Sequence, residues 1–579
     1  MRDTLTTAVR QAILDAGIAP APEEAPEGAD VPPGRNGSAR GEGGPALPPV
    51  HLERPARLEH GDWSSNVALT LAKRAGRNPR QLAAELASRL SAEPPPHVAR
   101  IEVAGPGFLN FHLLDSWLHE SLEQVVEQGT ETYGRSDLGQ GERVQIEFVS
   151  ANPTGPLHVG NGWFASYGDA LARVMERSGY RVHREYYVND TGGQIRQLGR
   201  SLLARRRGEA PPEEGYQGAY VADLAADYEG PDEAGPGAEP RAEDVEAAGR
   251  FAVERILAQI RATLARLGIV FDEWVSQASF ETGAAVEETI DLLRRRGLVF
   301  EQDGATWLRS TELGDTRDRP LRRSAERGGD YTYLAGDLAY HRDKFLVRGF
   351  DRVIDVLGAD HHGQVASLQA GLEGLGVDPG RLEVKLGQLV SVVGQDGPMS
   401  KRAGNFVSLD QLVDELDALG DGPGATRLLS LVGSIDHPTT LDLEVVRRQS
   451  AENPVYYVQY AYARIASIER VRAERAIERR PLGEVDLSLL THPRELDVLR
   501  ALTELPEVVE LACKDRAPHK VTTWVRDLAG RFHAFYHDCY VIGDVPPEQT
   551  QARLWLVEAT RVGLAVGLDL LGVEAPEAM

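Results

Sequence analysis

The segment from Val144 to Val188 constrains the fold more than any other part of this sequence. Residues 144–149 alternate polar and apolar side chains as a half-buried strand does, and the loop SANPTGPLHVGN follows them. Apolar residues then recur at helical spacing from about Gly162, Gly179 is placed to end that helix, and residues 182–188 predict a second strand. Two parallel strands joined by a helix form the first half of a doubly wound nucleotide-binding sheet, whose ligands lie at the carboxyl ends of the strands.

The remaining chain supplies more strands and then a long helical region. Residues 353–357 and 389–393 predict strands that end in glycine-containing loops. From Asn453 to the last residue the apolar spacing is helical, which predicts an all-α bundle. The expected fold class is therefore multidomain α/β: a Rossmann-like parallel-sheet domain with an N-terminal α/β appendage and a C-terminal helical bundle.

Two polar stretches interrupt these patterns. Residues 20–50 are rich in Pro, Gly and Ala and almost lack large apolar side chains, so we expect a disordered insertion there. Residues 207–242, with PPEEG and EGPDEAGPGAEP, predict an acidic loop or hinge insertion. The expected domains are residues 1–115, 116–445 and 446–579.

Composition limits the classes of protein to which the chain can belong. The 579 residues are 42% hydrophobic and 26% charged, as in ordinary globular proteins. The two cysteines, Cys513 and Cys539, lie in no CxxC pair or Cys/His cluster, so we expect neither a disulfide framework nor structural zinc. The N-terminus lacks an uninterrupted apolar core, and no 18-residue apolar run follows. These features favour a cytoplasmic protein without a membrane span.

The net charge of −25 argues at first against a nucleic-acid partner, because Lys and Arg neutralise phosphates. The charge is uneven, however. Acidic residues are concentrated at 209–246, whereas residues 447–531 are rich in arginine. A basic nucleic-acid-binding face fits that distribution, although a solvated helical face is the commoner cause of such a run.

The loop at residues 151–161 suits an anion. Backbone N–H groups and the positive end of the helix dipole can hold a phosphate chain, and His158, just before the helix, can donate a hydrogen bond to a phosphoryl oxygen. For an isolated match of this kind, a tight turn with an N-capping Asn is the preferred interpretation.

A second loop, GPMSKRAGN at residues 397–405, offers a flexible cation. It lies between a predicted strand and a helix that Ser408 caps, with Gln411 three residues later. Lys401 could move onto the charge that develops as pyrophosphate leaves an α-phosphate. Taken alone, this sequence is more often an ordinary polar surface loop.

Both loops resemble the two signature loops of class I aminoacyl-tRNA synthetases, in the form found in the arginyl-tRNA synthetase family. Further resemblances to that family span nearly the whole chain outside the two insertions. They are GDWSSNVAL near the N-terminus, VNDTGGQI at 188–195, YTYLAGDLAYHRDKF at 331–345, VIDVLGADHHG at 353–363 and NPVYYVQYAYARI at 453–465. The resemblance implies a ligase that activates L-arginine with ATP and then transfers arginine to the terminal adenosine of tRNA(Arg), in the catalytic domain at 116–445.

The resemblance also implies an arginine site. Glu147, Ser150 and Asn152 match positions that hold the amino acid's backbone groups, and Tyr333 and Asp337 match the pair that binds the guanidinium. At i and i+4 the latter two would share a helical face, and an aspartate can accept a two-pronged bond from a guanidinium. Without the resemblance, a core tyrosine beside a solvated aspartate would be the simpler interpretation.

The implied ATP site combines both loops with one residue after the strand at 353–357. Its residues are Pro153, Thr154, Gly155, His158, Gly160, Asn161, His361, Met399, Ser400 and Lys401. His158 and Lys401 would be the catalytic pair that stabilises the transferred charge, and Mg²⁺ would accompany ATP. A metal site at Asp360 with His361 and His362 is the competing interpretation, and nothing else in the sequence completes it.

The implied tRNA contacts lie at both ends of the chain. Tyr456, Tyr460 and Arg464 would read the anticodon, although packing explains the two tyrosines about as well, and the N-terminal domain would bind the tRNA body. We expect a monomer. A catalytically silent tRNA-binding paralogue is the alternative, but it should have lost Lys401, Asp337 or Asn152, and all three are present.

Two positions depart from the class pattern. Asn161 stands at the last histidine of the first signature, and Pro398 at the first lysine of the second. An asparagine amide can still donate a hydrogen bond, but it carries no positive charge, so altered ATP binding is one expected consequence.

Overall fold

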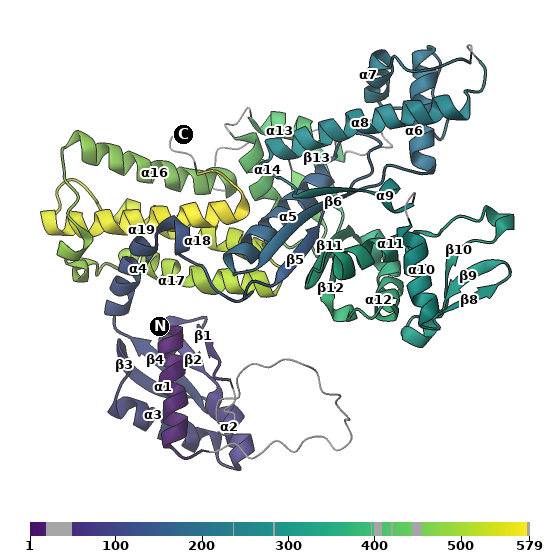
Figure 1. Ribbon diagram of the computed structural model, residues 1–579. Coiled ribbons are helices and arrows are strands. Elements are labelled where there is room, and N and C mark those ends of the chain that lie inside the picture. The colour runs from purple at the N-terminus through teal and green to yellow at the C-terminus, as the bar shows by residue number, and fades with distance from the viewer. Residues whose placement is uncertain are drawn as a thin grey trace. The chain divides into compact units, whose positions relative to one another are not determined.

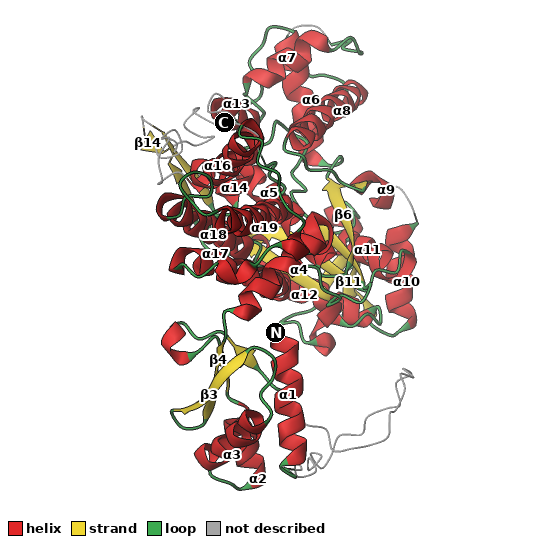
Figure 2. Cartoon of the chain, turned by 90° about the vertical axis from the view of Figure 1, so that its left-hand side faces the viewer, coloured by secondary structure: helices red, strands yellow, loops and turns green. Residues whose placement is uncertain are grey.

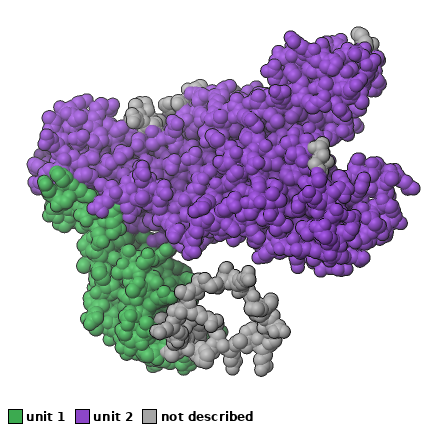
Figure 3. Space-filling model, in the orientation of Figure 1, with its two compact units in different colours: residues 1–124, 481–499 green, residues 125–480, 500–579 purple. Residues whose placement is uncertain are grey.

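The computed structural model divides the chain into two compact units. Unit 1 comprises residues 1–124 and 481–499, and unit 2 comprises residues 125–480 and 500–579 (Figure 3). Within them the structure describes residues 1–18, 49–234, 237–281, 284–394, 397–398, 408–417, 421–442 and 454–575. The predicted disordered insertion therefore lies almost wholly outside the described residues. None of the helices in the described ranges is long and apolar enough to span a membrane.

Unit 1 contains an antiparallel sheet with helices, which confirms the predicted N-terminal α/β appendage. Its strands follow the order β1 (Leu52–Glu53), β2 (Trp63–Ser65), β4 (Phe108–Leu113) and β3 (Val98–Ala104). Its helices are α1 (Arg2–Asp15), α2 (Val67–Ala75), α3 (Pro79–Ala92) and the first part of α4 (Ser116–Thr132). Helices α2 and α3 are separate, because Gly76 ends α2 in the left-handed region and the Asn78 side chain caps α3.

Unit 2 is built around a five-stranded parallel sheet, which confirms the predicted Rossmann-like domain (Figure 1). The strand order is β12 (Leu382–Gly387), β11 (Arg352–Gly358), β5 (Arg143–Glu147), β6 (Arg181–Val188) and β7 (Glu273–Ser276). The strand order reverses at β5. From β5 the chain passes through α5 (Val159–Arg177) to β6, which pairs with one edge of β5, while β11 pairs with its other edge. Such a switch point opens a crevice at the carboxyl ends of the strands.

Helix α5 packs close to the sheet. A Cβ atom at Gly168 would lie 2.2 Å from the Phe148 ring, so only glycine lets the helix approach that closely. The helix begins at Val159, three residues before the predicted start, and Gly179, with a φ of 86°, follows its end as expected.

The segment predicted as an acidic loop contains a helix, so that prediction was wrong for part of its length. Residues 193–266 form a helical arm of α6 (Gly193–Arg206), α7 (Ala219–Asp227) and α8 (Ala242–Arg266) between β6 and β7 (Figure 1). Helices α6 and α8 meet at two glycines, since a Cβ at Gly199 would lie 2.2 Å from the Val245 carbonyl oxygen and one at Gly249 would lie 2.9 Å from that of Ile195.

The chain between β7 and β12 carries the smaller elements of unit 2. They are α9 (Gln277–Glu281), α10 (Ala285–Arg295), an antiparallel sheet of β8 (Val299–Gln302), β9 (Ala305–Leu308) and β10 (Arg319–Arg322), then α11 (Tyr333–Arg342), a π-helical turn (Asp343–Val347) and α12 (Val365–Gly374).

A third sheet and the helical region follow β12. The strand predicted at 389–393 is β13 (Val390–Gly394), and it pairs with β14 (Gly397–Pro398) and β15 (Thr439–Asp442) rather than with the main sheet. Helices α13 (Leu409–Asp417) and α14 (Gly422–Ser430) lie between those strands in sequence. The predicted bundle is confirmed as α16 (Pro454–Glu474), α17 (Pro493–Lys514), α18 (His519–Asp538) and α19 (Pro547–Leu571). Figures 1 and 2 show α16, α18 and α19 side by side.

Candidate active site

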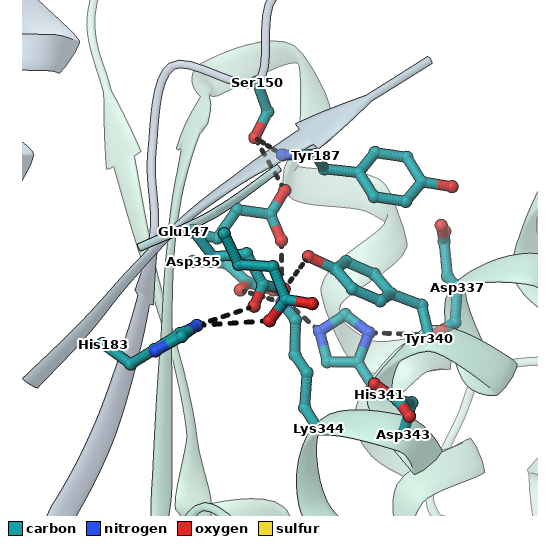
Figure 4. Close-up of polar contacts among 12 residues, drawn as sticks. Glu147, Ser150, His183, Tyr187, Asp337, Tyr340, His341, Asp343, Lys344 and Asp355 are labelled. Atoms are coloured by element: carbon teal, nitrogen blue, oxygen red, sulfur yellow. Dashed lines mark hydrogen bonds and ion pairs between the residues drawn. The ribbon is translucent and has the colours of Figure 1, made fainter. Parts of the chain in front are cut away.

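The loop after β5 begins with unusual backbone. Val149 and Ser150 have φ angles of 69° and 36°, in the left-handed region that non-glycine residues rarely adopt. Ser150 is held there by its side chain, because its Oγ donates to Glu147 Oε1 at 2.9 Å and accepts from the Tyr187 N–H at 3.1 Å (Figure 4). Backbone strain of this kind is typical of functional sites.

The same loop ends at His158, which is the N-cap residue of α5. The Asn161 side chain turns back and its Oδ1 accepts from the His158 N–H at 3.0 Å, as in a capping box. A Cβ at Gly160 would lie 2.8 Å from His158 Cε1, so glycine makes room for the ring beside the first turn. Asn161, the departure from the class pattern, therefore has a structural task at the helix N-terminus.

The segment that follows the second loop lies against the first. Leu409 N–H donates to the Leu157 carbonyl oxygen at 2.8 Å, and Ser408 forms a bridge with His158. Ser408 and Gln411 cap α13 reciprocally at 2.9 and 3.2 Å, as the sequence predicts. The segment that begins at Ser408 therefore lies beside the N-terminus of α5. Met399, Ser400 and Lys401 lie outside the described residues, as does the side chain of His361.

A buried network of charges supports Glu147. The Lys344 ammonium is fully buried and lies 2.7 Å from Glu147 Oε2 and 3.1 Å from Asp355 Oδ1 (Figure 4). His341 Nε2 lies 2.8 Å from Asp355 Oδ2, while its Nδ1 donates to the Asp337 carbonyl oxygen at 2.8 Å. Burial alone would raise the pKa of Asp355, but Lys344 and His341 lower it to about 2. The Glu147 carboxylate is thus fixed at the carboxyl end of β5.

Asp337 lies near this network without sharing its stabilisation. Burial, together with the negative charges of Glu147 and Asp355, raises the pKa of its carboxyl from 3.8 to about 6, although His341 and Lys344 oppose the shift. Tyr333, one turn earlier on α11, is 75% exposed. A carboxylate so placed favours a cation beside it, and a guanidinium fits that requirement.

A second network borders the first but does not fit a metal ion. His183, Glu185 and Glu273 bring ligand atoms within 4.8 Å of one another. The Arg348 guanidinium already bridges the two carboxylates, at 2.9 Å from Glu273 and in contact with Glu185, which also accepts from Tyr340. The pKa of Glu185 is held well below its usual range: burial raises it, but bonds from His183 and Arg348 prevail. This cluster is a structural ion-pair network.

Apart from Glu147, the residues of these two networks were not predicted from the sequence. Tyr340, His341 and Lys344 lie within the 331–345 motif, and Asp355 lies in the middle of a strand predicted to be buried. Asp355 was the signal in the sequence that could have indicated the first network, because a carboxylate inside a buried strand requires a cationic partner.

The helical region presents an aromatic surface with one cation in it. Tyr456 and Tyr460 stack with centroids 5.6 Å apart, and the Arg464 guanidinium lies 4.4 Å from the Tyr460 ring and 4.8 Å from the Tyr536 ring. His533 fixes that arginine, because its Nε2 donates to the Tyr457 carbonyl oxygen at 3.0 Å and its Nδ1 accepts from Arg464 at 2.9 Å. Tyr460 and Tyr536 are each 38% exposed. Tyr536 was not predicted.

Comparison with known structures defines the fold. A methionyl-tRNA synthetase from Mycobacterium tuberculosis matches 74% of this chain over 92% of its own, with a TM-score of 0.51 and 15% identity. An arginyl-tRNA synthetase from Thermus thermophilus matches 100% of both chains, with a TM-score of 0.74 and 23% identity. This chain therefore shares the fold of these two synthetases.

Sequence comparison identifies the family. Residues 3–113 match the arginyl tRNA synthetase N terminal domain, residues 239–419 the catalytic domain of tRNA synthetases class I (R), and residues 458–579 the DALR anticodon binding domain. The chain is 46% identical over 543 residues to an arginine–tRNA ligase of Frankia alni and 44% identical over 540 residues to one of Syntrophotalea carbinolica. Each alignment covers 92% of this chain and 95% of the relative. The chain belongs to the arginyl-tRNA synthetase family.

Proposed function

We propose that this protein is an arginine–tRNA ligase that uses ATP. The arginine carboxylate attacks the α-phosphorus of ATP in line. The bond from that phosphorus to the oxygen that bridges it to the β-phosphate breaks, so that pyrophosphate leaves and arginyl-adenylate remains. The 2′-hydroxyl of the terminal adenosine of tRNA(Arg) then attacks the adenylate carbonyl, loses its proton and expels AMP. The observation that carries the proposal is the carboxyl of Asp337, whose pKa is raised to about 6 because burial outweighs the partial compensation by His341 and Lys344.

Arginine would be held at both ends. Its guanidinium would pair with Asp337 while Tyr333, exposed on the same helix, packs against it. Its ammonium would bind Glu147, whose two oxygens keep acceptor capacity beside Lys344 and Ser150. Asn152 would contribute through its side-chain oxygen, since its Nδ2 donates to Gln194 at 3.1 Å. A site built on a paired charge rejects analogues that lack the guanidinium.

ATP would bind along the first loop. Residues 153–155, Gly160 and His158 would contact its phosphates at the N-terminus of α5, with Asn161 fixing the cap. His361, Met399, Ser400 and Lys401 complete the proposed ATP site, and Lys401 would neutralise charge in the transition state. Mg²⁺ would arrive with the ATP phosphates, because the one histidine–carboxylate group of the described residues is bridged by Arg348.

The partners and domains form the rest of the proposal. Tyr456, Tyr460 and Arg464 would contact the anticodon in the domain at 446–579, and the domain at 1–115 would bind the tRNA body. The catalytic domain would span 116–445. We propose a cytoplasmic monomer, which light scattering after gel filtration would test. The catalytically silent alternative is not supported by the 44–46% identity to arginine–tRNA ligases.

ATP–pyrophosphate exchange with each amino acid, with and without tRNA, tests the function. We expect exchange with arginine alone among the amino acids, dependent on tRNA, and lost for the most part in Lys401→Ala. If the protein binds tRNA but no amino acid supports exchange, the ligase assignment is wrong.

A further inference from the structure

One residue of the helical arm reaches the loop proposed to bind ATP. Tyr220 is the second residue of α7, outside the parallel sheet, and its hydroxyl donates to the Thr154 carbonyl oxygen at 2.6 Å. The ring is largely enclosed, and burial raises the pKa of its hydroxyl, which therefore stays a donor throughout the working pH range.

Two glycines shape the position of this ring. A Cβ at Gly155 would lie 3.1 Å from both Cζ and the hydroxyl oxygen of Tyr220. On the chain just before the helix, a Cβ at Gly218 would lie 2.4 Å from Cε1 of the same ring. A side chain at residue 155 would therefore require the Tyr220 ring to shift by a few tenths of an ångström. This complementarity goes beyond a chance surface contact.

The arm supplies two of three anchors on this stretch of loop. Besides Tyr220, Gln194 of α6 accepts from Asn152 Nδ2 at 3.1 Å, and Tyr186 of β6 donates to the Ala151 carbonyl oxygen at 2.9 Å. Since a trans peptide directs its C=O and N–H in opposite directions, the bond to the Thr154 carbonyl turns the Gly155 N–H away from Tyr220.

We propose that Tyr220 is a positioning residue for ATP: it fixes the 154–155 peptide so that the Gly155 N–H is directed at the nucleotide phosphates. The proposal rests on the proposed function of the loop. It makes the helical arm part of the ATP site, although none of the arm's side chains need contact ATP.

Tyr220→Phe tests the proposal, because it removes the hydroxyl and keeps the ring. Loss of one net hydrogen bond is expected to raise the KM for ATP roughly fivefold, with the KM for arginine unchanged. Gly155→Ala should also raise the KM for ATP, because the new Cβ displaces the ring. Tyr228→Phe is the matched control, since the Tyr228 hydroxyl donates to the Pro231 carbonyl oxygen within the arm at 3.3 Å, and it should leave both constants unchanged.

Hydrogen exchange of the loop gives a readout that does not need activity. Peptides that cover residues 150–157 should exchange faster in Tyr220→Phe than in wild type or Tyr228→Phe, while the midpoints of thermal unfolding of the two variants stay alike. An unchanged KM for ATP, or loop exchange equal to that of Tyr228→Phe, overturns the proposal. If wild type shows no arginine-dependent exchange of pyrophosphate, the proposed function fails, and the loop measurement with added ATP still decides the role of Tyr220.

Discussion

Asparagine in place of Asp337 should make the ligand-free protein more stable while it removes arginine binding. The pKa of this carboxyl rises from 3.8 to about 6 on folding, so ionisation costs stability. The sign follows from linkage: the folded state is favoured while Asp337 is protonated, below pH 3.8, and that advantage is lost as the pH rises through 6. The full shift corresponds to about 3 kcal/mol. Because Asp337 is only partly buried, we expect about 1–2 kcal/mol.

Urea unfolding at two pH values measures this effect. At pH 8, Asp337→Asn should unfold at a higher urea concentration than wild type. At pH 5 the difference should be roughly halved, because the wild-type carboxyl is then mostly protonated when folded but still ionised when unfolded. Asp291→Asn, at an exposed position on α10, is the control and should shift the free energy of unfolding by less than about 0.5 kcal/mol.

Calorimetric titration with arginine measures the effect of Asp337→Asn on arginine binding. Loss of a charge-assisted pair should weaken arginine binding by about 2–5 kcal/mol, which is at least about 30-fold. Wild-type affinity should also fall about tenfold from pH 7 to pH 5, because arginine selects the ionised carboxyl. If Asp337→Asn is less stable than wild type at pH 8, or binds arginine within threefold of it, the assignment of Asp337 is wrong.

Three further variants test other parts of the site. Lys344→Met leaves two buried carboxylates without the ammonium that pairs with them, so the free energy of urea unfolding should fall by about 3–5 kcal/mol. An unchanged urea midpoint would show that the network does not stabilise the fold. Asn161→Ala removes the capping bond to His158 and should lower the free energy of thermal unfolding by about 1 kcal/mol. If the variant is as stable as wild type, the capping bond does not stabilise the protein. Tyr536→Ala should raise the KM for tRNA roughly tenfold and leave the KM values for ATP and arginine alone, whereas a change in all three would indicate misfolding.

The elements around the first loop could be predicted because their signals are local. Alternation marks β5, helical spacing marks α5, and the Ser408–Gln411 pair marks the start of α13, each within a few residues. The partners of β13 could not be predicted, because the choice of sheet depends on β15, almost 50 residues later in the chain. Helix α7 was missed because its polar, Gly- and Pro-rich flanks conceal nine helical residues.

The candidate site divides in the same way. Glu147, Ser150 and His158 lie in one continuous segment, so their neighbourhood follows from the strand and the loop. Lys344 and Asp355 reach Glu147 only through the pairing of β5 with β11, which no local pattern shows. Their burial depends on tertiary structure and could not be predicted locally, because a lysine after a helix is ordinarily solvated.

Unit 1 is assembled from two stretches of chain that are far apart, and this bears on how it folds during synthesis. Residues 1–124 are synthesised before residues 481–499, and the 356 residues from 125 to 480 are made between them. At about 5–20 residues per second, that interval is roughly 20–70 s. Until then His119 cannot donate to the Leu490 carbonyl oxygen, which it contacts at 3.1 Å in the finished fold. Unit 1 is therefore begun before unit 2 but can be completed only after most of unit 2 has been synthesised.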